Sequence, residues 1–498
     1  MASLNGTQQR RDAPLTPYKG LIPYAEEDAA FFFGRDAERD LIVANLAASR
    51  LTLLYGPSGV GKSSLLNAGV ASYLRTQQQQ QVRLLGNPEA VVVVFNSWRD
   101  DPIRGLAEAI QTTVRHAWDT SYVAAPPHAS GSEASSSSAR PFLDVLRSGA
   151  DLIDGDLIVI LDQFEEYFLY HGQEDGAGTF AAEFPRAVNS AAVRASFLVS
   201  VREDALAKLD RFEGRIPNLF SNYLRVEHLD RDSAREAIER PIGRYNRELV
   251  DRGHNRTVQI EPALVEAVLD QIKTGRVLLG ETGLGVFAEH EDERPTRGEH
   301  IETPYLQLVM RRLWAEDVES NGGDRAPANR TSTIRRATLE RLGGAERIVR
   351  THLDATMETL TPHQRDVAAG IFHYLVTPSG TKIDHSAADL AEYARLSEAE
   401  VGPVLEIMAG SNARVLQPIA PPLDQPDVVR YEIFHDVLAP AILDWRTRYA
   451  QAQERAASEL ELAAERRRVW RLRVGLVGVT VLLLAVVGLA FFAVQQRD

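Results

Sequence analysis

Residues 56–63 read Gly-Pro-Ser-Gly-Val-Gly-Lys-Ser, a full match to the pattern Gly-x-x-x-x-Gly-Lys-Ser/Thr. The apolar run LTLLY at 51–55 precedes this stretch, and the helix-like SSLLNAGVASYLR follows from Ser63. Glycines allow successive backbone N–H groups to turn toward one oxyanion, and a helix N-terminus adds positive charge. The stretch therefore predicts a phosphate-binding loop with nucleotide contacts from Gly56, Pro57, Ser58, Gly59, Val60, Gly61, Lys62, Ser63 and Ser64.

Acidic and hydroxyl side chains complete the expected nucleotide site. In such a loop Lys62 reaches the β- and γ-phosphates of ATP, or the β-phosphate of ADP, and the Ser63 hydroxyl is a ligand for Mg²⁺. The apolar run LIVILD at 157–162 ends in Asp162, which we expect to hold the same Mg²⁺ through water. One of Glu165 and Glu166 is expected to polarise the attacking water, and their position in the sequence does not decide between them.

Three more strand-like runs accompany these two, namely VVVVF at 91–95, SFLVSV at 196–201 and YLRVEHL at 223–229. Five short apolar strands separated by helical stretches predict an α/β fold, a parallel five-stranded sheet with helices on both faces. Arg202 follows the strand after the acidic strand. We expect it to contact the γ-phosphate and so to distinguish ATP from ADP.

Composition excludes several classes of protein. The 498 residues include 69 acidic and 55 basic side chains, for a formal net charge of -14. This balance argues against a surface that binds nucleic acid throughout. Cysteine is absent, which excludes disulfides and cysteine-based metal sites.

The C-terminal region is apolar and almost uncharged, unlike the acidic chain as a whole. Residues 474–494 read VGLVGVTVLLLAVVGLAFFAV, without a charge, and as a helix they would span ~31 Å, close to the ~30 Å hydrocarbon core of a bilayer. Five arginines lie just before this run, between 466 and 473. Because positively charged flanks of a membrane span stay on the cytoplasmic side, they predict that the preceding chain is cytoplasmic. The sequence predicts a single-pass anchor in the cell membrane with the bulk of the chain cytoplasmic.

The region between the expected sheet and the anchor has two helical parts. Residues 230–325 show helical spacing of apolar residues around a glycine-rich, acidic stretch at 280–300. Residues 338–445 read as three helices, a strand pair at 415–420 and 427–434, and a last helix, the order of a winged helix-turn-helix. The expected recognition helix, 397–412, carries three glutamates and no lysine or arginine, so we do not expect DNA as a partner.

Three further stretches are biased in composition. Gln77–Gln81 and the serine-rich 121–140 are predicted to be mobile loops on the nucleotide-binding core. Residues 446–473, rich in alanine, glutamate and arginine, are predicted to form a stalk helix.

Several motifs point to a known family. The N-terminal pieces are Pro17–Leu21, Glu26–Asp28 and Phe32–Asp36, directly upstream of the phosphate loop. With LDQFEEYF, AIERP at 237–241, TPYLQLVMRRLW at 303–314 and YEIFHDVLAPAILDW at 431–445, the chain resembles the novel STAND-type NTPases, bacterial signalling ATPases. The resemblance runs from about residue 17 to 445.

The resemblance and the composition of the two ends together predict a domain order. The order is a disordered N-terminus (1–16), an NTPase core (17–229), a helical lid (230–325), a winged-helix domain (326–445), a stalk helix (446–473) and a transmembrane helix (474–494). The resemblance alone implies three weaker contacts, with His435 at the β-phosphate of ADP, Pro241 near the adenine, and Gly34 and Arg35 on the other side of the base or ribose.

The function implied is that of a molecular switch with an ADP-bound resting form and an ATP-bound oligomer. Hydrolysis should be slow and Mg²⁺-dependent, since no arginine finger is evident in the sequence. Expected partners are the nucleotide, the membrane, other copies of the chain and an unidentified sensor or effector. The alternative is a non-catalytic membrane scaffold or receptor module in which the nucleotide is structural.

Overall fold

The computed structural model describes residues 16–119, 141–273, 300–320, 331–377, 382–410, 413–419, 428–434 and 438–495, with the side chains of only part of the last helix. The chain forms two compact units, Met1–Ala441 and Ile442–Asp498. The predicted disorder at 1–16, the serine-rich 121–140 and most of the acidic stretch 280–300 lie outside the described residues, Thr16 and His300 excepted.

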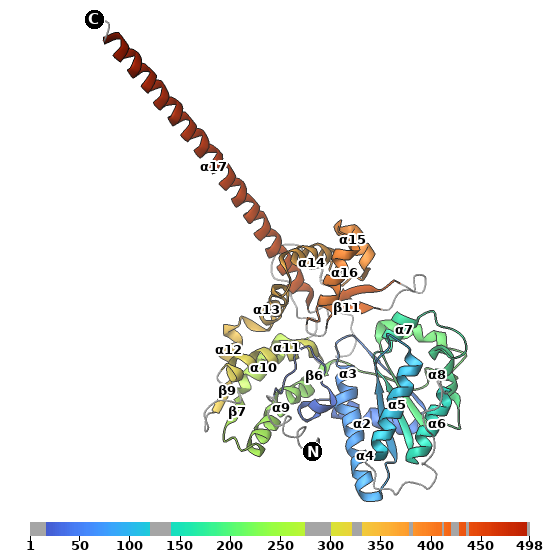
Figure 1. The fold of residues 1–498 in the computed structure, drawn as a ribbon. Helices are drawn as coiled ribbons and strands as arrows, with labels where there is room; N and C mark the ends of the chain where they lie inside the picture. Colours follow the sequence, from blue (N-terminus) through green and yellow to red (C-terminus); the bar gives the residue numbers. More distant parts are fainter. Residues whose placement is uncertain are drawn as a thin grey trace, which may run out of the picture. The chain divides into compact units, whose positions relative to one another are not determined.

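A five-stranded parallel sheet forms the centre of the first unit (Figure 1), as predicted. Its order is β2-β3-β4-β1-β5, with bounds β1 Leu51–Gly56, β2 Ala90–Phe95, β3 Asp156–Leu161, β4 Ala195–Arg202 and β5 Tyr223–Arg225. The fifth strand is shorter than the predicted 223–229. Leu229–Asp230 instead form β6, which pairs antiparallel with β8, His300–Ile301.

The acidic strand β3 is not the neighbour of β1, because β4 lies between them. Gly56 at the end of β1 is in register with Arg202 at the end of β4, and β4 pairs on its other side with β3. The carboxyl ends of parallel strands meet at one edge of the sheet. This order therefore brings the phosphate loop, Arg202 and Asp162 to the same edge.

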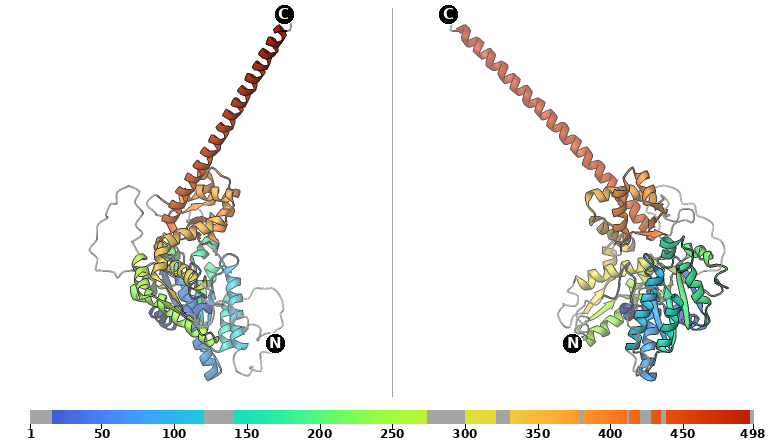
Figure 2. Two further views of the ribbon diagram at one scale, coloured as in Figure 1. Left: turned by 90° about the vertical axis from the view of Figure 1, so that its left-hand side faces the viewer. Right: turned by 45° about the vertical axis from the view of Figure 1, so that its right-hand side comes forward.

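Two layers of helices cover the sheet (Figure 2), and successive residues of each strand alternate between them. Val91, Val93, Leu157 and Val159 pack with helices α5 (Pro102–Asp119), α6 (Phe142–Ile153) and α8 (Phe180–Asn189). Val92, Ile158 and Ile160 pack on the other face, with α2 (Asp36–Ala48) and the π-helix Leu65–Ala71.

The polyglutamine stretch is helical, so its prediction as a mobile loop was wrong. Gln77–Gln81 lie inside α4, Ser72–Leu85, which continues the helix that begins after the phosphate loop with α3, Lys62–Ser64. Glutamine has good helix propensity, and the helix before it was already nucleated. The Gln81 side-chain amide also donates to the Glu89 carboxylate, at 2.7 Å.

A helical region follows the sheet. It contains α9 (Arg231–Asp251), α10 (Pro262–Gln271), α11 (Thr303–Trp314), α12 (Arg336–Arg341) and α13 (Gly344–Glu358). A short parallel pair that the sequence did not predict, β7 (Thr257–Ile260) with β9 (Thr331–Ile334), joins its two halves. The Asp230 carboxylate caps α9 by accepting from the backbone N–H of Ser233.

The segment 361–434, which we call the C-terminal module, contains three helices and a small sheet in its described residues. The helices are α14 (Pro362–Leu375), α15 (Ala387–Ala394) and α16 (Glu398–Ala409), and each begins with a capping box, at Thr361, Ser386 and Ser397. The strands β10 (His385–Ser386), β12 (Arg430–Ile433) and β11 (Leu416–Ile419) form an antiparallel sheet in that order.

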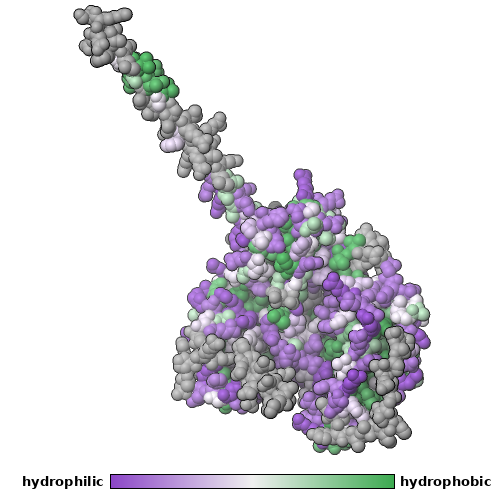
Figure 3. All heavy atoms as spheres, in the orientation of Figure 1, coloured by the Kyte–Doolittle hydropathy of each residue, from purple (hydrophilic) through white to green (hydrophobic). Residues whose placement is uncertain are grey.

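The last helix, α17, runs over 57 residues from Ala439 to Gln495 and covers the backbone of both the expected stalk and the expected span. Apolar side chains of its described part, including Val479, Leu482 and Val486, are exposed (Figure 3). Among the residues that the structure describes, no helix has the length and apolar character needed to cross a bilayer. Much of 474–494 has side chains outside that described part.

Candidate nucleotide site

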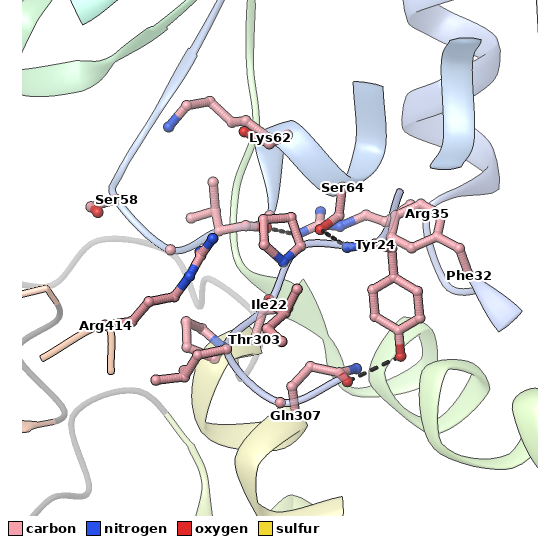
Figure 4. Close-up of a pocket in the computed structure, with 18 of the residues that line it drawn as sticks. Ile22, Tyr24, Phe32, Arg35, Ser58, Lys62, Ser64, Thr303, Gln307 and Arg414 are labelled. Carbon is pink, nitrogen blue, oxygen red and sulfur yellow. Dashed lines mark hydrogen bonds between the residues drawn. The ribbon is translucent and has the colours of Figure 1, made fainter. Parts of the chain in front are cut away.

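A cavity opens at the carboxyl edge of the parallel sheet (Figure 4), and five parts of the first unit line it. The N-terminal segment contributes Gly20–Tyr24 and Phe31–Phe33, and the phosphate loop contributes Ser58–Ser64. Strand β4 and the residues that follow β3 contribute Asp162, Glu165, Ser200 and Arg202. The helical region contributes Ala237, Thr303, Pro304 and Gln307, and the C-terminal module contributes Arg414, Gln417 and Phe434.

The phosphate loop depends on its glycines. Gly59 and Gly61 have φ of 79° and 94°, a conformation that L side chains disfavour. At Gly56 a Cβ atom would lie 2.4 Å from the carbonyl oxygen of Val226, so no larger residue fits there. Lys62 donates from Nζ to the carbonyls of Gly56 and Pro57, at 2.8 and 2.9 Å. Burial lowers the pKa of Lys62, and the neighbouring charge of Glu165 opposes that shift.

Asp162 is a buried carboxylate, 1% exposed, and neither of its oxygens has a hydrogen-bond partner of normal geometry in the described part of the chain. Burial raises its pKa, and the nearby hydroxyls of Ser63 and Ser200 partly offset the shift. Trp98 Nε1 donates to the Asp162 backbone carbonyl at 2.7 Å and so holds the end of the strand. Oxygen ligands suit Mg²⁺, so Asp162 with Ser63 fits the divalent cation that the sequence predicted.

The two candidate glutamates differ in position. Glu165 lines the cavity, and its Oε2 accepts from the backbone N–H of Arg202 at 3.2 Å. Glu166 is not among the lining residues, and burial together with the charge of Glu165 raises the pKa of Glu166 to about 7. Of the two candidate glutamates, Glu165 therefore faces the cavity and Glu166 does not.

Arg202 lines the cavity with its guanidinium held by two carboxylates. Nε and Nη2 donate to Asp204, at 3.0 and 2.6 Å, and Nη2 also donates to Glu432 Oε1 at 2.6 Å. Glu432 lies in β12 of the C-terminal module, is 6% exposed, and accepts in addition from Lys382 and Gln417. No local pattern in the sequence predicts this contact, because the partner belongs to a distant strand.

Gly34 and Arg35 hold the walls of the cavity together. Gly34 has a φ of 84°, and a Cβ there would lie 2.2 Å from the carbonyl of Ser233 in α9. Arg35 Nη2 donates to the carbonyls of Val60 and Glu227, at 3.0 and 2.8 Å. Arg35 therefore ties the phosphate loop to the segment after β5 and lines the cavity, whereas Gly34 is not a lining residue.

Of the other two residues taken from the resemblance, only Pro241 lies in the described structure, and it does not line the cavity. Pro241 is buried inside α9 and is not a lining residue, while Ala237, one turn earlier, and Pro304 in the first turn of α11 are. His435 lies outside the described residues. The sequence reasoning missed Pro304, Gln307 and Arg414 as lining residues; the helix start at Thr303-Pro304 was the available signal for the first.

Gln307 connects two walls of the cavity. The Tyr24 hydroxyl lies 3.0 Å from Gln307 Oε1 and 2.9 Å from the Pro17 carbonyl, and the Tyr24 backbone N–H donates to Ser64 Oγ at 3.1 Å. The N-terminal segment is thus bonded both to α11 and to the helix after the phosphate loop. This network therefore fixes the N-terminal wall of the cavity against the phosphate-loop side and α11.

The family model of novel STAND NTPase 1 matches residues 17–472. The chain belongs to the novel STAND NTPase 1 family. The resemblance predicted from the N-terminal motifs is thereby confirmed, and a STAND NTPase is by family a P-loop nucleoside triphosphatase. No curated protein sequence matches this one.

Solved structures similar to this STAND NTPase include a protein of Aeropyrum pernix and one of Pyrococcus abyssi. The Aeropyrum pernix ORC1 protein, in complex with DNA, is 15% identical at a TM-score of 0.40, with 83% of this chain and 93% of that one covered. A Walker-type ATPase of Pyrococcus abyssi is 15% identical at a TM-score of 0.42, with 86% and 99% covered. At these TM-scores the likeness adds nothing to the assignment of function.

Proposed function

We propose that this STAND NTPase is a membrane-anchored switch that binds and slowly hydrolyses ATP, with ADP in the resting form and an ATP-bound oligomer as the active form. The observation that supports the proposal is that separate parts of the first unit form the walls of one cavity. The core, α11 and the C-terminal module all contribute side chains to one cavity. If these parts have two arrangements, a nucleotide bound in the cavity changes the equilibrium between them. The size of that change is set by the difference in the nucleotide's affinity for the two arrangements.

The chemistry proposed uses residues at the carboxyl edge of the sheet. Asp162 and Ser63 would hold Mg²⁺, which supplies positive charge to the phosphates when bound. Lys62 would bind the phosphates, and Glu165 would accept a proton from, or orient, the water that attacks the γ-phosphate. Hydrolysis is slow in this proposal because Arg202, the arginine at the end of β4, is engaged by Asp204 and Glu432.

The anchor and the winged-helix assignment are parts of the same proposal. The uncharged run 474–494 and the five arginines before it support the anchor, and the three helices with an antiparallel sheet support a winged helix. DNA is not proposed as a ligand, since α16 carries Glu398, Glu400 and Glu406. A membrane-anchored oligomer would bring α17 helices together as its output to signalling or defence.

The test uses the full chain purified in detergent. Fluorescent ADP and ATP should bind, Lys62→Ala should bind neither while it keeps its melting temperature, and particle size should increase with a non-hydrolysable ATP analogue but not with ADP. Unchanged nucleotide binding by Lys62→Ala would contradict the site assignment. Equal particle size with both nucleotides would contradict the switch.

A further inference from the structure

Gln307 places a nearly buried amide in the wall of the cavity. It lies in α11, is 9% exposed and lines the cavity. Figure 4 shows its amide beside the Tyr24 hydroxyl, on the side of the cavity away from Lys62. A polar side chain with so little access to water needs hydrogen-bond partners. The direction in which its oxygen and its nitrogen point therefore determines what the wall offers to a ligand.

The Tyr24 hydroxyl decides the orientation of this amide. Its oxygen lies 2.9 Å from the backbone carbonyl of Pro17 and 3.0 Å from the nearer atom of the Gln307 amide. Burial raises the pKa of Tyr24, so the hydroxyl keeps its one hydrogen at neutral pH. If Oε1 of Gln307 faced Tyr24, that single hydrogen would meet two acceptors.

A half-turn of the amide satisfies both contacts. The Pro17 carbonyl can only accept, whereas an amide can present either its oxygen or its nitrogen to a neighbour. Tyr24 then donates to Pro17, and Nε2 of Gln307 donates to the Tyr24 oxygen, over the same two distances. Because buried carbonyls are almost always paired, this is the favoured arrangement.

The second atom of the Gln307 amide is accessible from the cavity. Within the residues that the structure describes, this atom makes no hydrogen bond, and it is not among the fully buried atoms that lack a partner. With Nε2 directed to Tyr24, the accessible atom is Oε1. The wall therefore presents a fixed hydrogen-bond acceptor to a ligand.

The cavity also sets the direction in which a nucleotide lies. Charged groups around the Lys62 amine, Glu165 among them, mark the end where the γ-phosphate would react. On another side of the phosphate loop, the Tyr24 backbone N–H donates to Ser64 Oγ at 3.1 Å. A nucleotide with its phosphates on the loop and its γ-phosphate toward Glu165 extends its base toward Tyr24 and Gln307.

We propose that Oε1 of Gln307 accepts a hydrogen bond from the 6-amino group of adenine and so makes the site selective for adenine nucleotides. Adenine attached to ribose has one strong donor, the 6-amino group, whereas hypoxanthine and guanine carry an acceptor oxygen at the same carbon. The inference rests on the proposed function in taking ATP and ADP as ligands, and it adds the residue that distinguishes the base. Tyr24 is a positioning residue, since it orients the amide.

The test compares three diphosphates that differ in the group at C6 of the purine: ADP, purine riboside diphosphate with a hydrogen there, and IDP with an oxygen. The full-length wild type in detergent should bind ADP about threefold to tenfold more tightly than purine riboside diphosphate, since one neutral hydrogen bond is lost. IDP should bind more weakly still, because two acceptors then face each other. A wild type that binds IDP as tightly as ADP overturns the proposal.

Two variants test the residues themselves. Gln307→Met removes the amide and keeps a side chain of similar length, so it should bind ADP and purine riboside diphosphate equally. Tyr24→Phe removes the hydroxyl that orients the amide and should reduce the preference for ADP over IDP. Wild-type ratios in Gln307→Met, or in Tyr24→Phe if the methionine variant does not fold, overturn the proposal.

Gln259→Met is the matched control. Gln259 lies in β7 of the helical region, is exposed and is not a lining residue. This variant should keep the wild-type affinities for all three diphosphates, which shows that the loss of a glutamine elsewhere does not change base selectivity. A wild type that binds none of the three would instead refute the proposed function.

Discussion

Nη2 of Arg202, at the end of β4, lies 2.6 Å from Oε1 of Glu432 in β12, although the two residues are 230 positions apart in the sequence. Both side chains are buried, at 9% and 8% exposure. The arginine that the sequence predicts to contact a γ-phosphate is therefore paired with a carboxylate of the C-terminal module. If Arg202 binds a γ-phosphate as proposed, that phosphate and Glu432 compete for the same guanidinium, and the competition would couple the bound nucleotide to the position of the module.

Glu432→Gln should release Arg202 for the nucleotide. The neutral amide attracts the guanidinium less, so the affinity for an ATP analogue should increase relative to that for ADP, by about threefold to tenfold. The loss of a buried charge partner should also lower the free energy of unfolding by about 1–3 kcal/mol. Titration with both nucleotides and urea unfolding measure the two effects.

The matched control for this variant is Glu398→Gln, at an exposed position in α16 of the same module. It should leave both measurements unchanged. An affinity ratio in Glu432→Gln equal to that of the wild type would show that the pair is structural and does not compete with the γ-phosphate.

Glu165→Gln should abolish turnover and leave binding intact. Proton transfer by a positioned carboxylate contributes about 10²–10⁴-fold to rate, so phosphate release should fall by at least 10²-fold. Glu166→Gln, one residue further and outside the cavity lining, is the natural comparison and should retain most of the activity. If Glu166→Gln lost turnover and Glu165→Gln retained it, Glu166 would be the catalytic carboxylate instead.

Asp162→Asn should raise the stability of the nucleotide-free protein and remove its response to Mg²⁺. Burial raises the pKa of Asp162, so the charged form is a cost to the folded state at neutral pH. An asparagine avoids that cost and should increase the melting temperature without ligand. ATP-analogue affinity should respond to Mg²⁺ and to EDTA in the wild type only, and a variant that still responds would exclude Asp162 as the metal-binding residue.

The pKa of about 7 at Glu166 predicts a pH effect on stability. Its folded-state pKa lies above the ordinary value of 4.5, so the folded state binds more protons between these pH values, and stability falls as pH rises through them. The loss amounts to at most about 3 kcal/mol. Urea unfolding at pH 5 and pH 7.5 should show a smaller decrease in Glu166→Gln than in the wild type, whereas equal decreases would contradict the shift.

Local features of the sequence were sufficient for much of the fold. The glycines of 56–63 predicted the phosphate loop because each acts through its own φ or a close approach. Apolar runs predicted the strands, since a strand buried on both faces needs an unbroken apolar sequence. Thr361, Ser386 and Ser397 marked helix starts because a capping box involves only four consecutive residues.

Local reasoning failed where a competing local signal was stronger or a boundary depended on pairing. Gln77–Gln81 looked too polar to pack, yet a helix already begun before them continues through at little cost. The predicted fifth strand ended early because Leu229–Asp230 pair with His300–Ile301 rather than with the parallel sheet. Such pairing depends on residues about seventy positions away, which no short window contains.

The sequence by itself thus determined that a nucleotide is bound, where the phosphate loop lies, and which acids follow the third strand. Only the tertiary structure decided that β4 lies between β1 and β3, that Glu165 rather than Glu166 faces the cavity, and that Glu432 and Arg414 reach the site. The physical reason is the distance along the chain between the residues that interact. Backbone conformation and capping depend on adjacent residues, whereas strand order and buried ion pairs depend on packing between segments that only the folded chain brings together.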